Sequence, residues 1–551
     1  MENISNKNIE KLIDAIKSLD ERIERIEKHI KYESESSVAE LDSIIDKEQS
    51  SEEKEDALEY AIGGRWFAKM GIVVLSFGIL FLLSTPYENT ASYLPSLIGF
   101  VIAGFIFAGA FAIRNPYPQI SGYLLGGSII LVYFSVMRLH FFGAEVTITS
   151  LPVIVALLLI VTAIHLFVAL KRNSIHFAYW SLLLGYTTAL ISDSAFFIFA
   201  LIIVISSVAV YLCVKREWMN LIFFGIFFSY LTHFMWFSNN PFLGKPIEAV
   251  SLPLNLLFIL CYAVIFALGN ILRQNDKEEN YFVTAASFLN AGSAYALLLL
   301  TTYLSPFEYS GIYHLFGAIV FMALAVTFWV REQSKLSTFV YAMTAYVALS
   351  FAIINLFTGS DIFILLCWQS LLVVSTAVWF RSKLIIISNF IIYVCVFIAY
   401  LIAIQTVSLV SISFGIVALL SARILNWKKE QLELQTEQMR NAYLIVALLV
   451  IPYALYHSLA VNYVSYAWVA VALIYYWISK LLKNKKYRWM SLATLLMTVI
   501  YVLIFGITTE ETTDGILAFL VLGIILLLMS LIYTKKRTKI DSVENSEQTF
   551  H

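Results

Sequence analysis

Charged side chains are scarce in this sequence: Asp, Glu, Lys and Arg make up 14% of the 551 residues, whereas 60% are hydrophobic. An ordinary soluble domain carries about 25% charged residues. The composition therefore excludes a typical soluble protein. It is typical of a chain made of many apolar helices that cross a membrane.

Cysteine is scarce, and recognisable catalytic motifs are absent from the sequence. The sequence contains no zinc-ligand spacing, no phosphate-binding glycine loop and no nucleophile motif. The chain is therefore expected not to be an enzyme, and no catalytic, cofactor-binding or metal-binding residue is nominated. The four cysteines have no disulfide or metal spacing and are interpreted as small apolar side chains: Cys213, Cys261, Cys367 and Cys395.

Ionisable residues are absent from the middle of the predicted spans, where they usually mark a functional site. The histidines His165, His233 and His457 lie near span ends. Three aspartates, Asp193, Asp361 and Asp514, each open a predicted helix. A role as the helix N-cap accounts for all three aspartates.

What the sequence does contain is about 18 apolar segments of membrane-spanning length, which predict an all-α integral membrane domain over residues 60–534. The first predicted span is Phe67–Leu83 and the last is Asp514–Tyr533. The fifth, His176–Ile191, is the weakest. The fourteenth, Thr406–Ala422, follows the thirteenth almost without a loop.

Basic residues alternate along the predicted connections. Connections after even-numbered spans are rich in Lys and Arg, whereas those after odd-numbered spans contain only Arg138 and Lys245. Arg65 and Lys69 precede or open the first span. By the positive-inside rule, this pattern places both termini in the cytoplasm and supports an even number of spans.

A loose repeat indicates stacked helical hairpins. Several predicted spans end with an aromatic and a basic residue, followed by a short basic turn. Trp329-Val330-Arg331 and Trp379-Phe380-Arg381 are the clearest copies. The pattern suits hairpins packed in sequence, although the same ends serve as interfacial anchors in many membrane proteins.

The N-terminal segment, residues 1–32, shows a heptad pattern with isoleucine at the a positions and mainly leucine at the d positions. This pattern favours a parallel two-stranded coiled coil, and hence a homodimer joined through residues 9–30. An amphipathic helix that does not associate is the alternative. Residues 33–59 are predicted to be a flexible acidic linker, and residues 535–551 a cytoplasmic tail. The a residues are Ile9, Ile16, Ile23 and Ile30, and the d residues are Leu12, Leu19 and Ile26.

Three stretches carry a resemblance to a known family. They are Leu58 to Trp66, which ends in Gly63-Gly64-Arg65-Trp66, then Gly126-Gly127, and Leu184-Gly185-Tyr186-Thr187-Thr188-Ala189. The chain resembles the bacterial family of many-span membrane proteins known only as a domain of unknown function, DUF2339. At the last stretch, family members have a proline that this sequence lacks. The resemblance implies the architecture and brings no established activity.

Two groups of polar residues are candidate sites. Asn290 and Gln369 are the deepest polar residues; they are predicted to bond neighbouring helices or, alternatively, to line a polar path. Arg138, His140 and Lys245 form a candidate anion site on the outer face. Pairing of these basic residues with Glu145, Glu248 and Asp193 is the favoured alternative for the second group.

Taken together, these features predict a multi-pass protein of the bacterial cytoplasmic (inner) membrane, a non-enzymatic scaffold or transporter-like component of an envelope system. A transporter or flippase for a lipid or glycan is the first alternative. An integral membrane glycosyl or acyl transferase is the second, weakened by the lack of an acidic site on a sizeable loop. Membrane lipid is the expected partner; neither nucleic acid nor a cofactor is expected.

Overall fold

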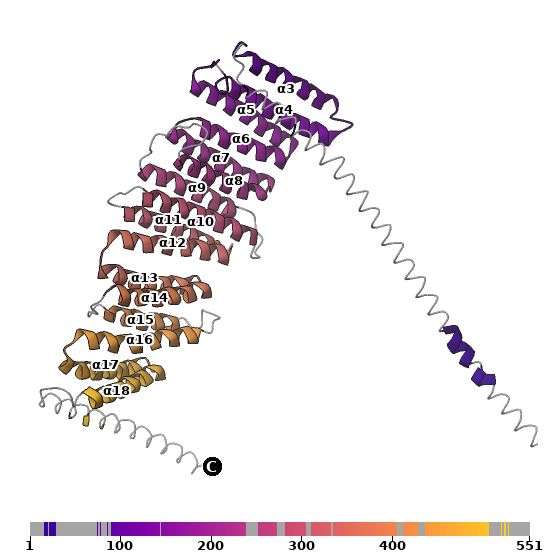
Figure 1. The fold of residues 1–551 in the computed structure, drawn as a ribbon. Helices are drawn as coiled ribbons and strands as arrows, with labels where there is room; N and C mark the ends of the chain where they lie inside the picture. Colours follow the sequence, from indigo (N-terminus) through magenta and orange to yellow (C-terminus); the bar gives the residue numbers. More distant parts are fainter. Residues whose placement is uncertain are drawn as a thin grey trace, which may run out of the picture. The chain divides into compact units, whose positions relative to one another are not determined.

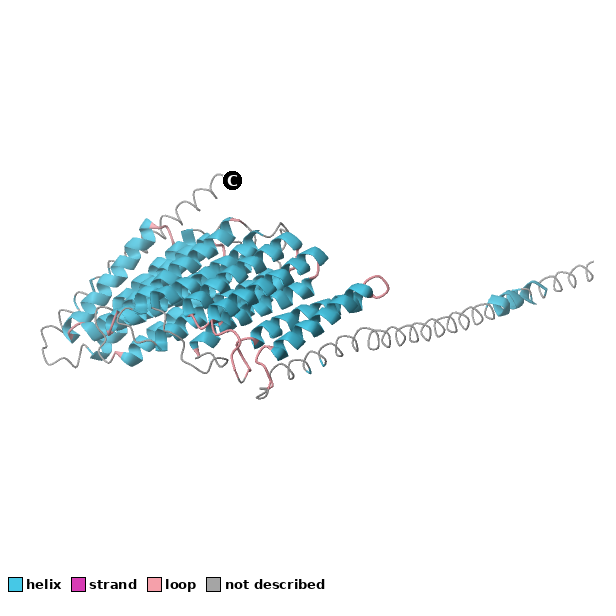
Figure 2. Cartoon of the chain, turned by 90° about the horizontal axis from the view of Figure 1, so that it is seen from above, coloured by secondary structure: helices cyan, strands magenta, loops and turns pink. Residues whose placement is uncertain are grey.

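The computed structural model describes two compact units, residues 1–181 and 182–551, which are treated separately below. Every regular element among its described residues is a helix (Figure 2). The described residues are 16–19, 21–28, 90–143, 145–238, 252–272, 281–304, 310–331, 334–404, 411–427 and 436–505, with the single residues 74, 78, 85, 520, 523, 524 and 527.

The first unit contains three long helices packed in chain order. These are α3 (Leu94–Ala112), α4 (Pro118–Arg138) and α5 (Leu151–Arg172). Helix α4 lies between α3 and α5. The hydroxyl of Ser121 on α4 donates to Ala110 O of α3 at 2.7 Å. Helix α6 (Ile175–Ile191) begins in this unit and ends in the next.

The second unit is a stack of helical hairpins (Figure 1). Each odd-numbered helix from α7 to α17 packs against the even-numbered helix that follows it. The helices are α7 (Ala195–Arg216), α8 (Asn220–Phe237), α9 (Leu252–Leu272), α10 (Tyr281–Leu304), α11 (Ser310–Val330), α12 (Lys335–Leu356), α13 (Ser360–Trp379), α14 (Lys383–Ala403), α15 (Ile412–Trp427), α16 (Thr436–Ser458), α17 (Val461–Leu481) and α18 (Lys485–Phe505).

Most contacts between hairpins join helices of the same parity, and consecutive helices of neighbouring hairpins, such as α12 and α13, also touch. Helices α8, α10, α12, α14, α16 and α18 pack one against the next, and so do α7, α9 and α11 as well as α13 and α15. Each hairpin therefore buries its faces against neighbours in the chain, as in soluble helical repeat proteins. The predicted arrangement of stacked hairpins is present in the second unit.

Side chains that face away from the core are apolar too. Phe105, Phe288 and Ile402 are 75%, 68% and 77% exposed, on α3, α10 and α14. A helix that is apolar on all sides belongs in a membrane, because water would penalise such a surface. Fourteen of the described helices are long and apolar enough to span a membrane, while α6 and α15 have only 17 and 16 residues.

The predicted spans agree with α3 to α18 in order, with one clear displacement. The fourteenth was predicted over Thr406–Ala422, whereas α15 covers Ile412–Trp427, so that the basic residue Arg423 lies inside the helix. Most of the predicted first and last spans, and the motif Gly63 to Trp66, lie outside the described residues. The count of 18 therefore stays a prediction.

Three hairpin turns share one backbone geometry. Positive φ angles of 50°, 50° and 49° occur at Asn173, Arg381 and Lys483. Asn173 directly follows the last residue of α5, whereas Arg381 and Lys483 lie one residue further beyond the ends of α13 and α17. In each turn the amide of the following residue bonds back to a carbonyl of the last helical turn in a Schellman pattern: Ser174 to Ala169 O, Ser382 to Ala377 O and Asn484 to Ser479 O. The repeat inferred from basic residues is thus also a repeat of turn structure.

The N-cap predictions for two of the three aspartates, Asp193 and Asp361, were wrong in position. Asp193 is in the left-handed conformation, with φ 56°, and Ser194 is the N-cap of α7. Asp361 lies in the first turn of α13, after the N-cap Gly359. Its carboxylate still favours the helix start through the dipole. Asp514 lies outside the described residues.

Gly415 lies at a close contact between two helices of the second unit. A β-carbon on Gly415 of α15 would overlap Ile451 Cγ1 of α16 and lie 2.8 Å from its Cδ1. Small residues at helix contacts let backbones approach in membrane proteins. A side chain larger than the hydrogen atom of glycine therefore does not fit at position 415 unless Ile451 moves.

Gly415→Ala is expected to destabilise the protein by about 1–3 kcal/mol through overpacking, read as a lower thermal unfolding midpoint in detergent. Gly292→Ala is the matched control, because nothing lies within 4 Å of a β-carbon there. Adding Ile451→Ala should recover part of the loss. Equal midpoints for the two glycine variants would contradict the close contact.

Candidate functional site

Asn290 is the centre of a polar cluster that joins four helices. It lies on α10 and is fully buried. The Tyr230 hydroxyl of α8 donates to Asn290 Oδ1 at 2.7 Å. The two amide hydrogens of Asn290 are donated to Ala263 O of α9 at 2.8 Å and to the Tyr341 hydroxyl of α12 at 3.0 Å. Both N–H groups of the amide are therefore used within the protein.

A second polar layer lies one helical turn away from Asn290. The Ser287 hydroxyl donates to Ser337 Oγ of α12 at 3.1 Å, and Asn270 Nδ2 of α9 donates to Ser287 Oγ at 3.5 Å. All three side chains are buried. The two layers of hydrogen bonds connect α9, α10 and α12.

Gln369 forms a separate pair and does not meet Asn290. Its amide nitrogen on α13 donates to Tyr346 O at 2.9 Å and to Ser350 Oγ at 3.1 Å, both on α12. The two predicted path residues thus bond to different residues of α12 and not to each other. The structure places each of them in a helix contact.

The sequence reasoning missed a second asparagine cluster that repeats the first. Asn389 of α14 is buried and donates to Ser370 Oγ of α13 at 2.8 Å and to the Tyr443 hydroxyl of α16 at 3.1 Å. In both clusters an asparagine on an even helix donates to a tyrosine on the next even helix. The paired residues, Asn290 with Tyr341 and Asn389 with Tyr443, are 51 and 54 positions apart in the sequence. This similar spacing is a sequence signal that could have indicated both clusters.

The residues of the predicted outer-face site bond to backbone carbonyls. Arg138 is 4% exposed and donates to Phe142 O and, at 3.0 Å, to Thr85 O. His140 Nδ1 lies 2.8 Å from Ile148 O. These bonds hold the segment that follows α4. Lys245 lies outside the described residues, so the three are not brought together here.

Buried histidines lie in aromatic surroundings. His233 of α8 stacks on Phe199 with ring centroids 4.2 Å apart, and its Nε2 lies 2.8 Å from Asn255 Oδ1. His314 of α11, which the sequence reasoning did not single out, lies with its Nε2 3.1 Å from Thr302 Oγ1. Among the described residues, no three His, Cys, Asp or Glu side chains are grouped to hold a metal ion.

The stretches behind the family resemblance are helical where they are described. Gly126 of α4 lies against the ring of Phe177, which in turn packs on His165 at 5.4 Å between centroids. Residues 184–189 continue α6 without a break. Tyr186 is buried, and its hydroxyl donates to Gly225 O at 3.2 Å and lies 2.8 Å from Ser229 Oγ.

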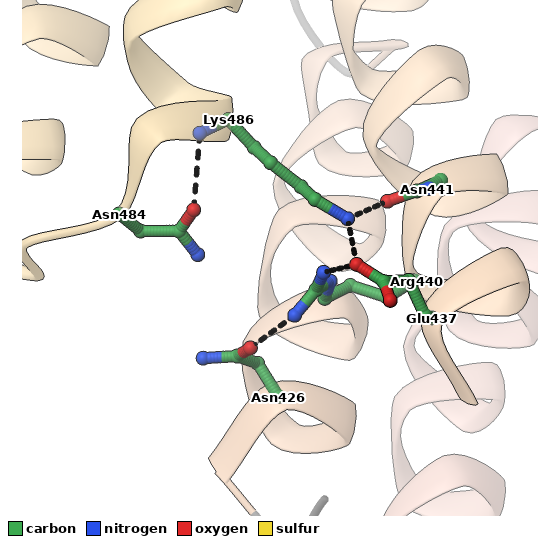
Figure 3. A network of polar contacts seen from close by, with 6 residues as sticks. All are labelled: Asn426, Glu437, Arg440, Asn441, Asn484 and Lys486. Atoms are coloured by element: carbon green, nitrogen blue, oxygen red, sulfur yellow. Dashed lines mark hydrogen bonds and ion pairs between the residues drawn. The ribbon is translucent and has the colours of Figure 1, made fainter. Parts of the chain in front are cut away.

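A network of charged and amide side chains lies where α15 ends and α16 and α18 begin (Figure 3). Arg440 and Lys486 both bond to Glu437 Oε1 at 2.8 Å. Arg440 also donates to Asn426 Oδ1 and Lys486 to Asn441 Oδ1. We call these five residues the Arg440 cluster: Asn426, Glu437, Arg440, Asn441 and Lys486.

The Arg440 cluster was not predicted, because its basic members were counted only as loop charges. Arg440 lies inside the first turns of α16, where a cation is disfavoured by the helix dipole. The acidic partner three residues earlier, Glu437, offsets that effect. A Glu-x-x-Arg sequence at a predicted helix start is the signal that could have revealed it.

Comparison with known proteins agrees with the resemblance noted in the sequence. Neither a curated protein nor a solved structure matches the chain significantly. Residues 63–460, well over half of the chain, match the family described as "Predicted membrane protein (DUF2339)". The chain therefore belongs to the DUF2339 family of predicted membrane proteins.

Proposed function

We propose that this protein is a non-enzymatic scaffold of the bacterial cytoplasmic membrane, with both termini in the cytoplasm. The observation that carries the proposal is that the deepest polar side chains bond to neighbouring helices. Asn290 and Gln369, the residues best placed to line a path, donate their amides to neighbouring helices. A helical stack that joins its members in this way is suited to hold partners in the membrane rather than to pass a solute.

The proposed orientation rests on charge. Basic residues follow the even-numbered predicted spans, and the turn residues Arg381 and Lys483 lie in two of those connections. Lys383, at the first position of α14, is exposed at the same end. Positive residues of short loops remain on the cytoplasmic side during insertion.

Cysteine labelling tests both the scaffold and its orientation. In a variant without the four native cysteines, Asn290→Cys should resist a water-soluble, membrane-impermeant thiol reagent added from either side. Position 290 is fully buried within the protein. A water-soluble reagent reacts only with thiols that water can reach. Lys383→Cys is the accessible control, and should react only from the cytoplasmic side.

Each of two results would contradict the proposal. Reaction of the Asn290→Cys variant, at a rate comparable to that of the control, would indicate a water-filled path and favour a transporter or flippase for a lipid or glycan. Reaction of Lys383→Cys from outside intact cells would contradict the orientation, because it requires an error in the number of preceding spans.

The scaffold is further proposed to be a homodimer joined by the N-terminal heptads. Residues 16–19 and 21–28 are helical. Their seam side chains Ile16, Leu19, Ile23 and Ile26 are 60%, 56%, 49% and 56% exposed in the single chain. An apolar stripe left exposed along a short helix is suited to a second copy. The linker over residues 33–59 lies outside the described residues.

A further inference from the structure

The Arg440 cluster carries more positive than negative charge among the described residues. Glu437 is the one carboxylate bonded to it, and both Arg440 and Lys486 share the same oxygen of that group. Arg423, three residues before Asn426 on α15, adds a third cation at the same helix end. One carboxylate does not neutralise three cations.

Hydrogen-bond donors around the cluster are left without acceptors. Arg440 is 7% exposed, yet its Nε has no partner among the described residues. Within the same described part of the chain, the buried hydroxyl of Ser491 on α18 also has none. Ser491 lies one turn beyond Tyr487, the residue that follows Lys486 on α18. A buried donor without an acceptor is energetically costly, so an acceptor with several oxygens would be stabilised here.

The cluster is partly buried and partly exposed. The side chain of Arg440 is 9% exposed, whereas those of Lys486 and Glu437 are 30% and 55% exposed. A ligand at the surface therefore meets Lys486 and Glu437 first, with the guanidinium behind them. Helices α16 and α18 begin at this end and α15 ends there, so helix dipole ends of both signs lie near the cluster, and its excess of positive charge comes from the side chains.

Two tryptophans at the same helix ends indicate the depth of the cluster in the membrane. Trp427 closes α15 and Trp489 lies in the first turns of α18, and both are 73% exposed. Exposed tryptophans concentrate at the level of the lipid headgroups. We propose that the Arg440 cluster binds the phosphate of an anionic phospholipid, which enters between Glu437 and Lys486.

The phosphate oxygens would accept hydrogen bonds from the Arg440 guanidinium and the Lys486 ammonium, which binds phosphate as a point charge. Glu437 competes with the lipid for both groups. The carboxylate thereby keeps the cations together when no lipid is bound. This proposal does not depend on whether the protein is a scaffold or a transporter.

Thermal unfolding of the full-length protein in mild detergent tests the site. Phosphatidylglycerol should stabilise the wild type at lower concentration than phosphatidylcholine does. Lys486→Gln should weaken the apparent affinity for phosphatidylglycerol about fivefold, as expected for one cation near a headgroup. Lys383→Gln is the matched control, since it removes an exposed cation from the start of another helix, and should leave the affinity unchanged.

Glu437→Gln separates lipid binding from a purely structural role. If Glu437 competes with phosphate, the variant should bind phosphatidylglycerol more tightly than the wild type, by about fivefold. If Glu437 only holds the helices together, the variant should unfold at lower temperature and keep the wild-type lipid preference. The second result would overturn the proposal. This test does not require Arg440 itself to be replaced.

A third measurement uses inorganic phosphate in place of lipid. We expect millimolar phosphate to leave the unfolding temperature unchanged, because it lacks the acyl chains that hold a headgroup at this depth. Stabilisation by phosphate, with no difference between the two lipids, would overturn the assignment to a phospholipid and indicate a soluble phosphate compound.

Discussion

Ile16→Lys combined with Ile23→Lys is expected to abolish crosslinking between two copies through a cysteine placed at Leu19 or Ile26. These positions form the seam of the predicted heptads, and their side chains are exposed in the single chain. A charge without a partner in such a seam costs about 3–5 kcal/mol, which a coil of about three heptads cannot offset. Disulfide or bifunctional-thiol crosslinking in native membranes measures the effect.

Ser18→Lys combined with Glu24→Lys is the control for the seam variant. These residues lie at c and b positions, which face away from a partner in the heptad register. The control should crosslink as the parent does, with unchanged expression and membrane insertion. If the seam variant also crosslinks like the parent, the N-terminal helix is amphipathic rather than dimerising, and any self-association belongs to the membrane domain.

Asn290→Leu is expected to cause the largest loss of stability of any single polar-to-apolar change in the second unit. Leucine has a similar volume but removes three bonds, to Tyr230, Ala263 and Tyr341. Hydrogen bonds between membrane helices contribute about 0.6–1.7 kcal/mol each. The expected loss is therefore about 2–5 kcal/mol, measured by denaturing-detergent unfolding of the purified protein.

Two further variants make this expectation specific. Asn355→Leu is the control, because that exposed asparagine donates to Phe351 O of its own helix and accepts one long bond, of 3.4 Å, from the Ser310 hydroxyl of α11, so its loss should matter little. Tyr230→Phe in the Asn290→Leu background should restore part of the stability by removing the hydroxyl that donates to Asn290 Oδ1. Equal stability of Asn290→Leu and Asn355→Leu would mean that the cluster does not hold the four helices together.

Helix positions were predictable because apolar length is a local property of the chain. The predicted segments correspond to α3 to α18 with end shifts of one to a few residues. Helix α15 is the exception. It begins at Ile412, later than the predicted start at Thr406, which was assigned from hydropathy alone. The structure instead extends the helix past Arg423 to Trp427. A basic side chain near a helix end can remain at the interface while its backbone stays helical.

Contact partners were not predictable in the same way. The sequence singled out Asn290 as a deep polar residue, but Tyr230 and Tyr341 lie 60 and 51 positions away. Whether an amide lines a path or ties helices together depends on which helices surround it. The Arg440 cluster was not predictable for the same reason, because Glu437 and Lys486, which bond to each other, are separated by 49 positions.

Apolar composition and charge alternation, read from the sequence alone, determined the class of protein and the approximate limits of its helices. Both depend on the transfer of single segments into a membrane, where each helix satisfies its own backbone hydrogen bonds. Only the tertiary structure decided that hairpins stack by parity, that Gly415 meets Ile451, and that Arg440, Lys486 and Glu437 converge. Lipid-facing and core-facing surfaces are equally apolar here, so hydropathy does not distinguish them, and packing between distant segments determines which polar groups meet.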